Sequence, residues 1–144
     1  DIQSIDISEK AINVAKINSE KFHVNNISFK KLDFLKSGMK MFYNFDLLIS
    51  NPPYIPKKDM ESLMPEVRNY EPYSALTDNY DGLEFYRKFS TDLPYILNSN
   101  GIGIFEVGLS PHPNNAKRIL SKIGRSIKLL KDYNGDNRLL IVKL

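Results

Sequence analysis

The sequence Asn51-Pro52-Pro53-Tyr54 combines residue types that could bind a flat amino group. It directly follows the apolar run Phe45–Ser50, which is typical of a strand. Two successive prolines remove two backbone N–H donors and fix their φ angles, so the turn is rich in hydrogen-bond acceptors. These acceptors are the side-chain oxygen of Asn51 and the carbonyl groups of Asn51 and Pro52. Such a turn suits an enzyme that modifies a planar, weakly nucleophilic –NH2 group, with Tyr54 as an aromatic wall.

A proline pair can also simply end a strand. An apolar strand followed by Asn, two prolines and an aromatic residue rarely arises for packing alone, however, so we favour the functional interpretation. In a transfer reaction, Asn51 Oδ1 and the Pro52 carbonyl would accept from the two amino hydrogens and stabilise the positive charge that develops on the attacking nitrogen. We therefore predict that Asn51 and Pro52 are catalytic, and that Asn51, Pro52, Pro53 and Tyr54 bind the substrate.

Two acidic residues stand at the ends of earlier predicted strands. Asp6 ends the strand Ile2–Asp6 and precedes a helix, where it could accept from both hydroxyls of a nucleoside ribose or merely stabilise the helix N-terminus. Asp33 follows the strand Ile27–Leu32 and could accept from the exocyclic amine of adenine while Phe34 packs against the base. Taken alone, Asp33-Phe34 is better explained as an ordinary loop acid beside a core aromatic residue.

Strands and helices alternate along the chain and end in two strands around the turn 134–137. The other predicted elements are strands Gly101–Val107, Ile127–Lys131 and Leu139–Leu144 and helices Glu9–His23, Gly82–Leu97 and 114–123. This order predicts an α/β three-layer sheet with a terminal antiparallel strand pair. Ligands bind at the carboxyl ends of the strands in such sheets, so we predict that Asp6, Asp33 and Asn51 share one site.

Residues 55–80, with three prolines, predict a long irregular segment, and loops of that length are usually lids or binding loops. Glu106, at the end of a strand, faces either the crevice or the interior as a hydrogen-bonded acid, and both alternatives remain open. His112 stands between two prolines and is predicted to be a loop residue. With His23 far away and no cysteine in the chain, no metal site is predicted.

The 144 residues fit one domain, and their 42% hydrophobic content is that of a globular protein. Net charge is +3 and the pI is near 9.0, but the lysines are scattered, which argues against a nucleic-acid footprint. No apolar run approaches the ~20 residues of a membrane span, and no signal peptide is evident, so we predict a cytoplasmic protein without membrane contact. The chain starts at Asp1, without Met, and a predicted strand already begins at Ile2, which indicates part of a longer polypeptide.

Several segments together resemble the HemK/PrmC family, the peptide-chain-release-factor glutamine methyltransferases. The resemblance runs along essentially all of the chain and is most specific in the loop after the Asn-Pro-Pro-Tyr element. The matching segments are Ile5–Ser8, Asn51–Ile55, Val67–Pro72, Ala75-Leu76, Asp81–Leu83, Phe105–Gly108 and Asp132–Arg138. One departure lies around Ser110-Pro111, where the family usually carries a Gln.

The resemblance implies a seven-stranded Rossmann-like methyltransferase sheet that uses S-adenosylmethionine and yields S-adenosylhomocysteine. It implies methylation of the glutamine of a Gly-Gly-Gln motif in a release factor, a step connected with translation termination. Together with the residues above, we expect Asp6, Asp33, Phe34 and Asn51 to contact the cofactor and the protein to be a monomer. The family's first strand, Gly-rich loop and N-terminal helical domain have no counterpart in residues 1–144. We therefore expect a partial catalytic domain that is inactive as an isolated 144-residue chain.

Two other functions remain open from the sequence. The Asn-Pro-Pro-Tyr element is shared with amino methyltransferases that act on adenine in DNA or guanine in RNA, and stacking on Tyr54 would suit a base. A non-catalytic partner subunit without cofactor is the third possibility, because the Gly-rich loop has no counterpart in the chain.

Overall fold

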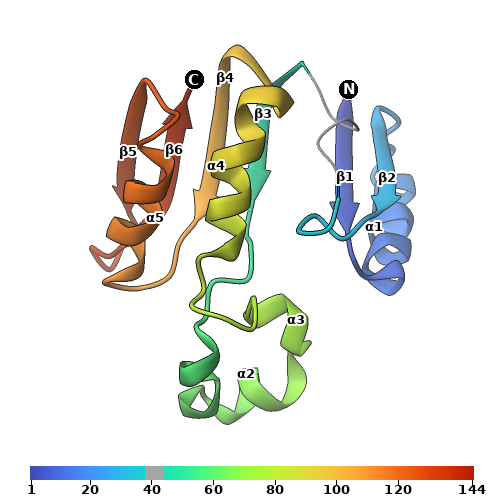
Figure 1. Cartoon of the computed structure of the whole chain (residues 1–144). Coiled ribbons are helices and arrows are strands. Elements are labelled where there is room, and N and C mark those ends of the chain that lie inside the picture. The colour runs from blue at the N-terminus through green and yellow to red at the C-terminus, as the bar shows by residue number, and fades with distance from the viewer. Residues whose placement is uncertain (38–43) are drawn as a thin grey trace. The chain divides into compact units, whose positions relative to one another are not determined.

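The computed structural model describes residues 1–37 and 44–144, which form six strands, five α-helices and one 3-10 helix. The chain consists of two compact units, residues 1–38 and 39–144, and each is described by itself (Figure 1).

The first unit is a parallel strand pair with one helix packed against it. Strand β1 (Ile2–Asp6) pairs with β2 (Ile27–Lys31), and helix α1 (Glu9–Lys21) connects them. The helix begins where predicted because Ser8 caps it: its Oγ accepts from the Ala11 N–H at 3.3 Å. Two parallel strands need a crossover connection of a dozen or more residues, and helix α1 provides it here.

The second unit contains a four-stranded mixed sheet in the order β3-β4-β6-β5. Strand β3 pairs with β4 in parallel, and β6 pairs antiparallel with both β4 and β5. The four strands are β3 (Phe45–Ser50), β4 (Leu97–Glu106), β5 (Ser126–Lys131) and β6 (Asn137–Lys143). The predicted antiparallel pair at the end of the chain is therefore confirmed as β5 and β6.

Helices α4 (Glu84–Ile96) and α5 (His112–Leu120) pack on one face of this sheet and against each other (Figure 1). The core between helices and sheet is apolar and fully enclosed. Its largest fully buried side chains are Tyr86, Phe105, Leu93, Leu120, Leu140, Val107 and Val142. Burial of side chains of this size, each stabilising by roughly 1.5–3 kcal/mol, holds the sheet and the two helices together.

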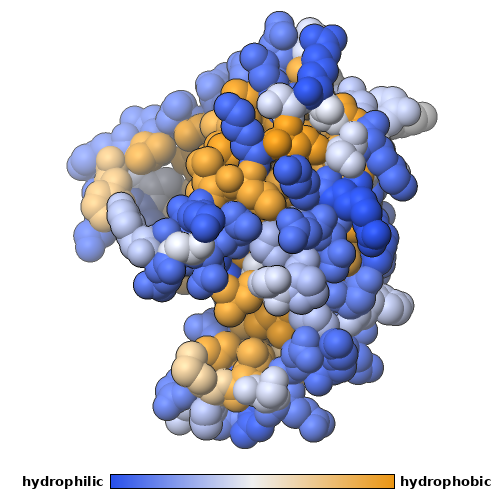
Figure 2. Space-filling model, turned by 90° about the vertical axis from the view of Figure 1, so that its left-hand side faces the viewer, coloured by the Kyte–Doolittle hydropathy of each residue, from blue (hydrophilic) through white to orange (hydrophobic). Residues whose placement is uncertain are grey.

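The opposite face of the sheet carries apolar side chains that are not enclosed. Leu47 and Ile49 of β3 are largely exposed, and they lie beside Ile102 and Ile104 of β4 in the parallel register. Figure 2 shows hydrophobic residues at several places on the otherwise hydrophilic surface. In the segment 55–80, Met64, Tyr70 and Tyr73 are also exposed.

The prediction that residues 55–80 are irregular was wrong in part. They contain a 3-10 helix, η2 (Lys57–Ser62), and two short helices, α2 (Pro65–Tyr70) and α3 (Tyr73–Leu76). Pro65 occupies the first turn of α2, where its missing N–H leaves no bond unmade. Pro56, Pro65 and Pro72 each lie at the start of one of these helices.

Helix α4 ends within one residue of the predicted Leu97. Pro94 lies inside it, and the helix continues to Ile96, because buried Leu93 and Ile96 hold its last turn in the core. Strand β4 begins at Leu97 instead of Gly101, directly where α4 ends. Within residues 1–37 and 44–144, no helix has the length and apolar character needed to cross a membrane.

Candidate active site at the end of strand β3

The turn Asn51–Tyr54 leaves the sheet at the carboxyl end of β3. Ser50, the last residue of the strand, still pairs with Phe105 of β4. Asn51 is exposed, whereas Pro52 is buried and Pro53 is half-buried. The rigid proline pair is therefore fixed against the protein while the Asn51 side chain reaches solvent.

Two acceptors of this turn have no donor in the described part of the chain. Across residues 1–37 and 44–144, no group donates a hydrogen bond to the Asn51 side chain or to the Pro52 carbonyl. A free carboxamide oxygen and a free carbonyl oxygen on one rigid turn can together accept from the two hydrogens of an –NH2 group.

The Tyr54 hydroxyl belongs to a closed hydrogen-bonded triangle. It donates to Glu106 Oε1 at 2.8 Å and accepts from Arg138 Nη2 at 3.0 Å. Arg138 Nη2 also donates to Glu106 Oε1 at 2.8 Å, and its guanidinium lies 5.6 Å from the centroid of the Tyr54 ring. Burial and the hydrogen bond to Glu106 raise the pKa of Tyr54, so the phenol keeps its proton and remains a donor.

Glu106 is thus a half-buried acid that is hydrogen-bonded within the protein, one of the two alternatives left open by the sequence. Its backbone carbonyl is also held, since it accepts from the hydroxyl of the fully buried Tyr86. The end of β4 is therefore fixed through both its side chain and its main chain.

The prediction that His112 is a loop residue was wrong. His112 is the first residue of α5 and is buried, with its ring 5.1 Å from that of Tyr86 and 5.8 Å from that of Tyr54. Nδ1 accepts from the Gly108 N–H at 3.2 Å, and Nε2 lies 2.9 Å from the Gly82 carbonyl. These partners require a neutral ring protonated on Nε2, and burial lowers the His112 pKa in the same sense.

The loop before α4 packs tightly against the turn. Gly82 has a φ of +81°, and a β-carbon there would lie 2.2 Å from the Tyr54 carbonyl oxygen. The buried carboxylate of Asp78 holds this loop by accepting from the N–H groups of Tyr80, Gly82 and Glu84. Only glycine allows both the positive φ and the close approach.

In the first unit, Asp6 and Asp33 lie at the same end of the strand pair. Asp6 pairs in register with Lys31, and the chain turns directly afterwards into Asp33. Asp6 Oδ1 accepts from the Ser8 N–H at 2.7 Å, and Asp33 forms an ion pair with Lys36 at 3.3 Å. Both acids therefore follow carboxyl strand ends, as does Asn51 in the second unit. Whether the three side chains and Phe34 form one site stays a prediction.

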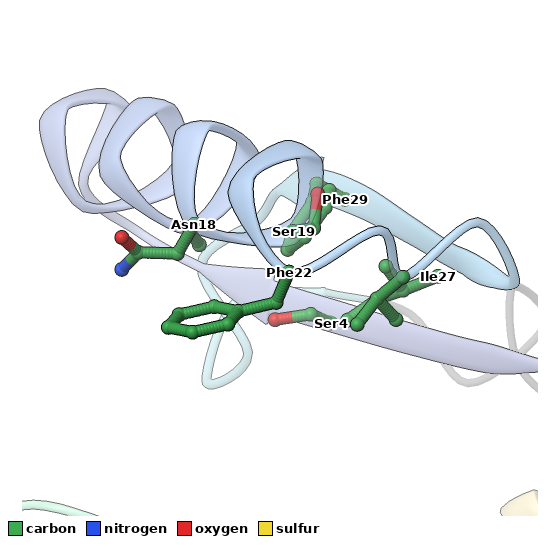
Figure 3. Close-up of a pocket in the computed structure, with 8 residues that line it drawn as sticks. Ser4, Asn18, Ser19, Phe22, Ile27 and Phe29 are labelled. Carbon is green, nitrogen blue, oxygen red and sulfur yellow. The ribbon is translucent and has the colours of Figure 1, made fainter.

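A hollow of about 350 Å³ also lies in the first unit, between α1 and the strands (Figure 3). Phe22, Ile27 and Phe29 make it largely apolar. Asp6, Asp33 and Phe34 are not among its lining residues, so this hollow is not the predicted nucleoside site.

The sequence interpretation named the turn but missed most of what supports it. Arg138 was named only within a segment that resembles the family. Gly82 was predicted to begin a helix but lies in the loop before α4, and no role was predicted for Tyr86. Opposite charges at the ends of neighbouring strands, Glu106 and Arg138, were the signal that could have indicated the ion pair.

Comparison with known proteins agrees with this architecture. Residues 1–99 match the family model described as "Methyltransferase domain". The release factor glutamine methyltransferase of Fusobacterium nucleatum is 39% identical over 142 residues, which cover 99% of this chain and 40% of that protein. The enzyme of the same name from Bacillus subtilis is 37% identical over 138 residues, 95% of this chain and 48% of that protein. The chain thus spans half or less of the length of these relatives.

Solved structures share the fold at low sequence identity. A methyltransferase from Pyrococcus furiosus superposes with a TM-score of 0.66 at 19% identity, covering 98% of this chain and 61% of that one. A putative methyltransferase from Streptococcus mutans, solved in complex with SAH, gives a TM-score of 0.58 at 14% identity, covering 98% and 74%. These likenesses confirm the predicted α/β, Rossmann-like fold class.

Proposed function

This chain belongs to the methyltransferase domain family, and we propose that the whole protein transfers a methyl group from S-adenosylmethionine to the side-chain amide nitrogen of a glutamine in a peptide chain release factor. The observation that carries the proposal is the acceptor turn Asn51–Tyr54, in which the Asn51 side-chain oxygen and the Pro52 carbonyl accept from no donor within residues 1–37 and 44–144. The names of the curated relatives, which match along nearly the whole chain, support the substrate.

An amide nitrogen is a poor nucleophile because its lone pair is delocalised into the carbonyl. In the proposed mechanism, Asn51 Oδ1 and the Pro52 carbonyl accept from the two hydrogens of the glutamine amide. The nitrogen gains positive charge as it attacks, so these contacts strengthen toward the transition state and accelerate the reaction rather than only binding substrate. They also aim the lone pair, which is a proximity effect. Tyr54 would pack on the amide plane.

The residues of the first unit fit a nucleoside. Two carboxylates, Asp6 and Asp33, end neighbouring parallel strands, and acids in that place can accept from ribose hydroxyls and from an adenine amine. Phe34 would pack against the base, and Asn51 would border the reacting end. When bound, S-adenosylmethionine would supply an activated methyl group on a sulfonium: the C–S bond breaks as the N–C bond forms, which leaves a thioether, and the nitrogen loses one of its two hydrogens to solvent as a proton.

The test is methyl transfer from labelled S-adenosylmethionine by the whole protein to a Gly-Gly-Gln-containing release factor. Asn51→Ala should lower kcat by roughly 10²–10³-fold, the scale of losing one preorganised polar group. Asn51→Asp should retain part of the activity, since a carboxylate still accepts. Asn13→Ala, which changes an exposed residue of α1, is the matched control and should leave kcat unchanged. Wild-type turnover by folded Asn51→Ala protein would refute the role of Asn51.

The same assay separates the other functions. Methyl label found in RNA or DNA rather than in the release factor would indicate a nucleic-acid amino methyltransferase. The pI of 9.0 and the aromatic ring of Tyr54 are compatible with that function. Calorimetric titration of the whole protein with S-adenosylhomocysteine tests the third possibility, because a non-catalytic partner subunit would not bind it.

A further inference from the structure

We infer that the Glu106–Arg138 ion pair is a positioning pair, which holds the Tyr54 hydroxyl and thereby fixes the directions of the Asn51 and Pro52 oxygens. The inference rests on the proposed function, because it assigns residues that act on the same turn. The two charged residues come from β4 and β6, whereas Tyr54 follows β3, so the triangle connects the ends of three adjacent strands.

The Tyr54 hydroxyl is fully used by this pair. It donates its single proton to Glu106 Oε1 and accepts from Arg138 Nη2. The hydroxyl is therefore held toward the protein rather than toward a substrate amide. Tyr54 can offer its ring to the substrate, but its polar end serves as a tether.

Tethering Tyr54 fixes the whole turn because the other end is already held. Ser50 is paired with Phe105, and the two prolines between Asn51 and Tyr54 have fixed φ angles. A four-residue turn with both ends held and two torsions locked has little freedom left. The directions of the Asn51 side chain and the Pro52 carbonyl then follow from where Tyr54 is placed.

Main-chain contacts hold Tyr54 from the other side but do not involve its hydroxyl. The Tyr54 carbonyl packs against Gly82, and the next N–H, of Ile55, donates to the Leu76 carbonyl at 3.0 Å. Arg138 and Glu106 are each a little over a quarter exposed, so neither charge is deeply buried, and the pair matters for geometry more than for stability.

Three variants of the whole protein test this pair. Tyr54→Phe removes the hydroxyl, Glu106→Gln removes the negative charge while keeping an acceptor oxygen, and Arg138→Met removes the double donor. Each should lower kcat about 10- to 100-fold with KM changed less than ~3-fold, because small misplacements of orienting groups act on the reacting geometry. Arg138→Lys should recover part of the loss. The double variant Tyr54→Phe/Arg138→Met should be no slower than the slower single variant, since both break one unit.

A second readout needs no substrate. Amide hydrogen exchange, followed by NMR at Asn51, Tyr54 and Ile55, should quicken about 10-fold in Tyr54→Phe and Glu106→Gln as the turn loosens. Tyr95→Phe, on the exposed side of α4, and Arg125→Met, an exposed arginine, are matched controls for loss of a phenol and of a guanidinium. Both should leave kcat and exchange at these amides unchanged.

The two proposals can fail separately. A wild-type protein that methylates no release factor overturns the proposed function, while exchange at the turn still tests the positioning pair. Wild-type kcat in Tyr54→Phe and Glu106→Gln, additive losses in the double variant, or unchanged exchange at the turn amides would each overturn the positioning pair. An equal kcat loss in the control variants would do so as well.

Discussion

Substitution of Gly82 by alanine tests the close packing between the loop before α4 and the Asn51–Tyr54 turn. The new β-carbon would lie 2.2 Å from the Tyr54 carbonyl oxygen, 2.9 Å from the Tyr54 carbonyl carbon and 3.3 Å from the Pro56 nitrogen. Ordinary contacts lie near 3.5 Å, so the loop or the turn must move by about 1 Å or more. Backbone atoms are what is contacted, and they cannot rotate away as a flexible side chain would.

The expected magnitude has two parts. Placing alanine at a φ of +81° costs roughly 1–2 kcal/mol, and relief of overpacking typically costs another 1–3 kcal/mol or so, giving about 2–5 kcal/mol in total. Gly135 is a matched control, because it also has a positive φ, +88°, but nothing lies within 4 Å of a β-carbon there. Gly135→Ala should therefore cost only the backbone part, about 1–2 kcal/mol.

Equilibrium urea unfolding of the whole protein measures both variants. With an m-value of about 2 kcal/mol per M, the midpoint should fall by ~1–2.5 M for Gly82→Ala and by ~0.5–1 M for Gly135→Ala. The difference between the two isolates the contact with Tyr54. If Gly82→Ala destabilises the protein no more than Gly135→Ala does, the loop does not press on the turn, and the described packing is wrong.

Two further predictions concern buried titratable groups in the second unit. Burial lowers the pKa of His112 below its unfolded value of about 6.5, so its contribution to stability is present above that pH and is lost as pH falls through the lower folded value. The free energy of unfolding in urea should therefore decline from pH 7.5 to 5, and His112→Gln should reduce this decline. An equal decline in both proteins would contradict the prediction. Asp92 is buried on α4 and pairs with Lys88 at 2.7 Å. Lys88→Met should cost about 1–3 kcal/mol by leaving a buried carboxylate without this partner, whereas Lys88→Met/Asp92→Leu should recover most of the loss, and an unaltered midpoint in the single variant would show that the pair is dispensable.

The elements that depend on local chemistry were predictable from the sequence. Ser8 caps α1 as expected, and the apolar run before Asn51 forms β3 with the proline turn directly after it. The pair β5 and β6 follows from two apolar runs around a turn in which Asp132 Oδ1 accepts from the N–H groups of Asn134 and Asp136. These features are encoded within a few residues, by capping, proline geometry and alternation of side chains.

The sequence also indicated the candidate chemistry, because the acceptor oxygens belong to Asn51 and Pro52 themselves, whereas the directions of these oxygens depend on distant residues. The resemblance followed from blocks of sequence, and the match of residues 1–99 to the family model confirms it at the level of a methyltransferase domain. What each predicted site residue does stays a prediction, and so does the joining of Asp6, Asp33 and Asn51 into one site.

The support of the turn was decided by tertiary structure alone. Glu106 and Arg138 are 32 positions apart, and Tyr54 is a further 52 positions from Glu106, so only the strand order β3-β4-β6 brings the three together. His112 looked like a loop residue because its partners, Gly82 and Gly108, are backbone groups that no motif marks. Long-range contacts of this kind depend on the order in which the strands pair in the sheet, and a local pattern of residues does not specify that order.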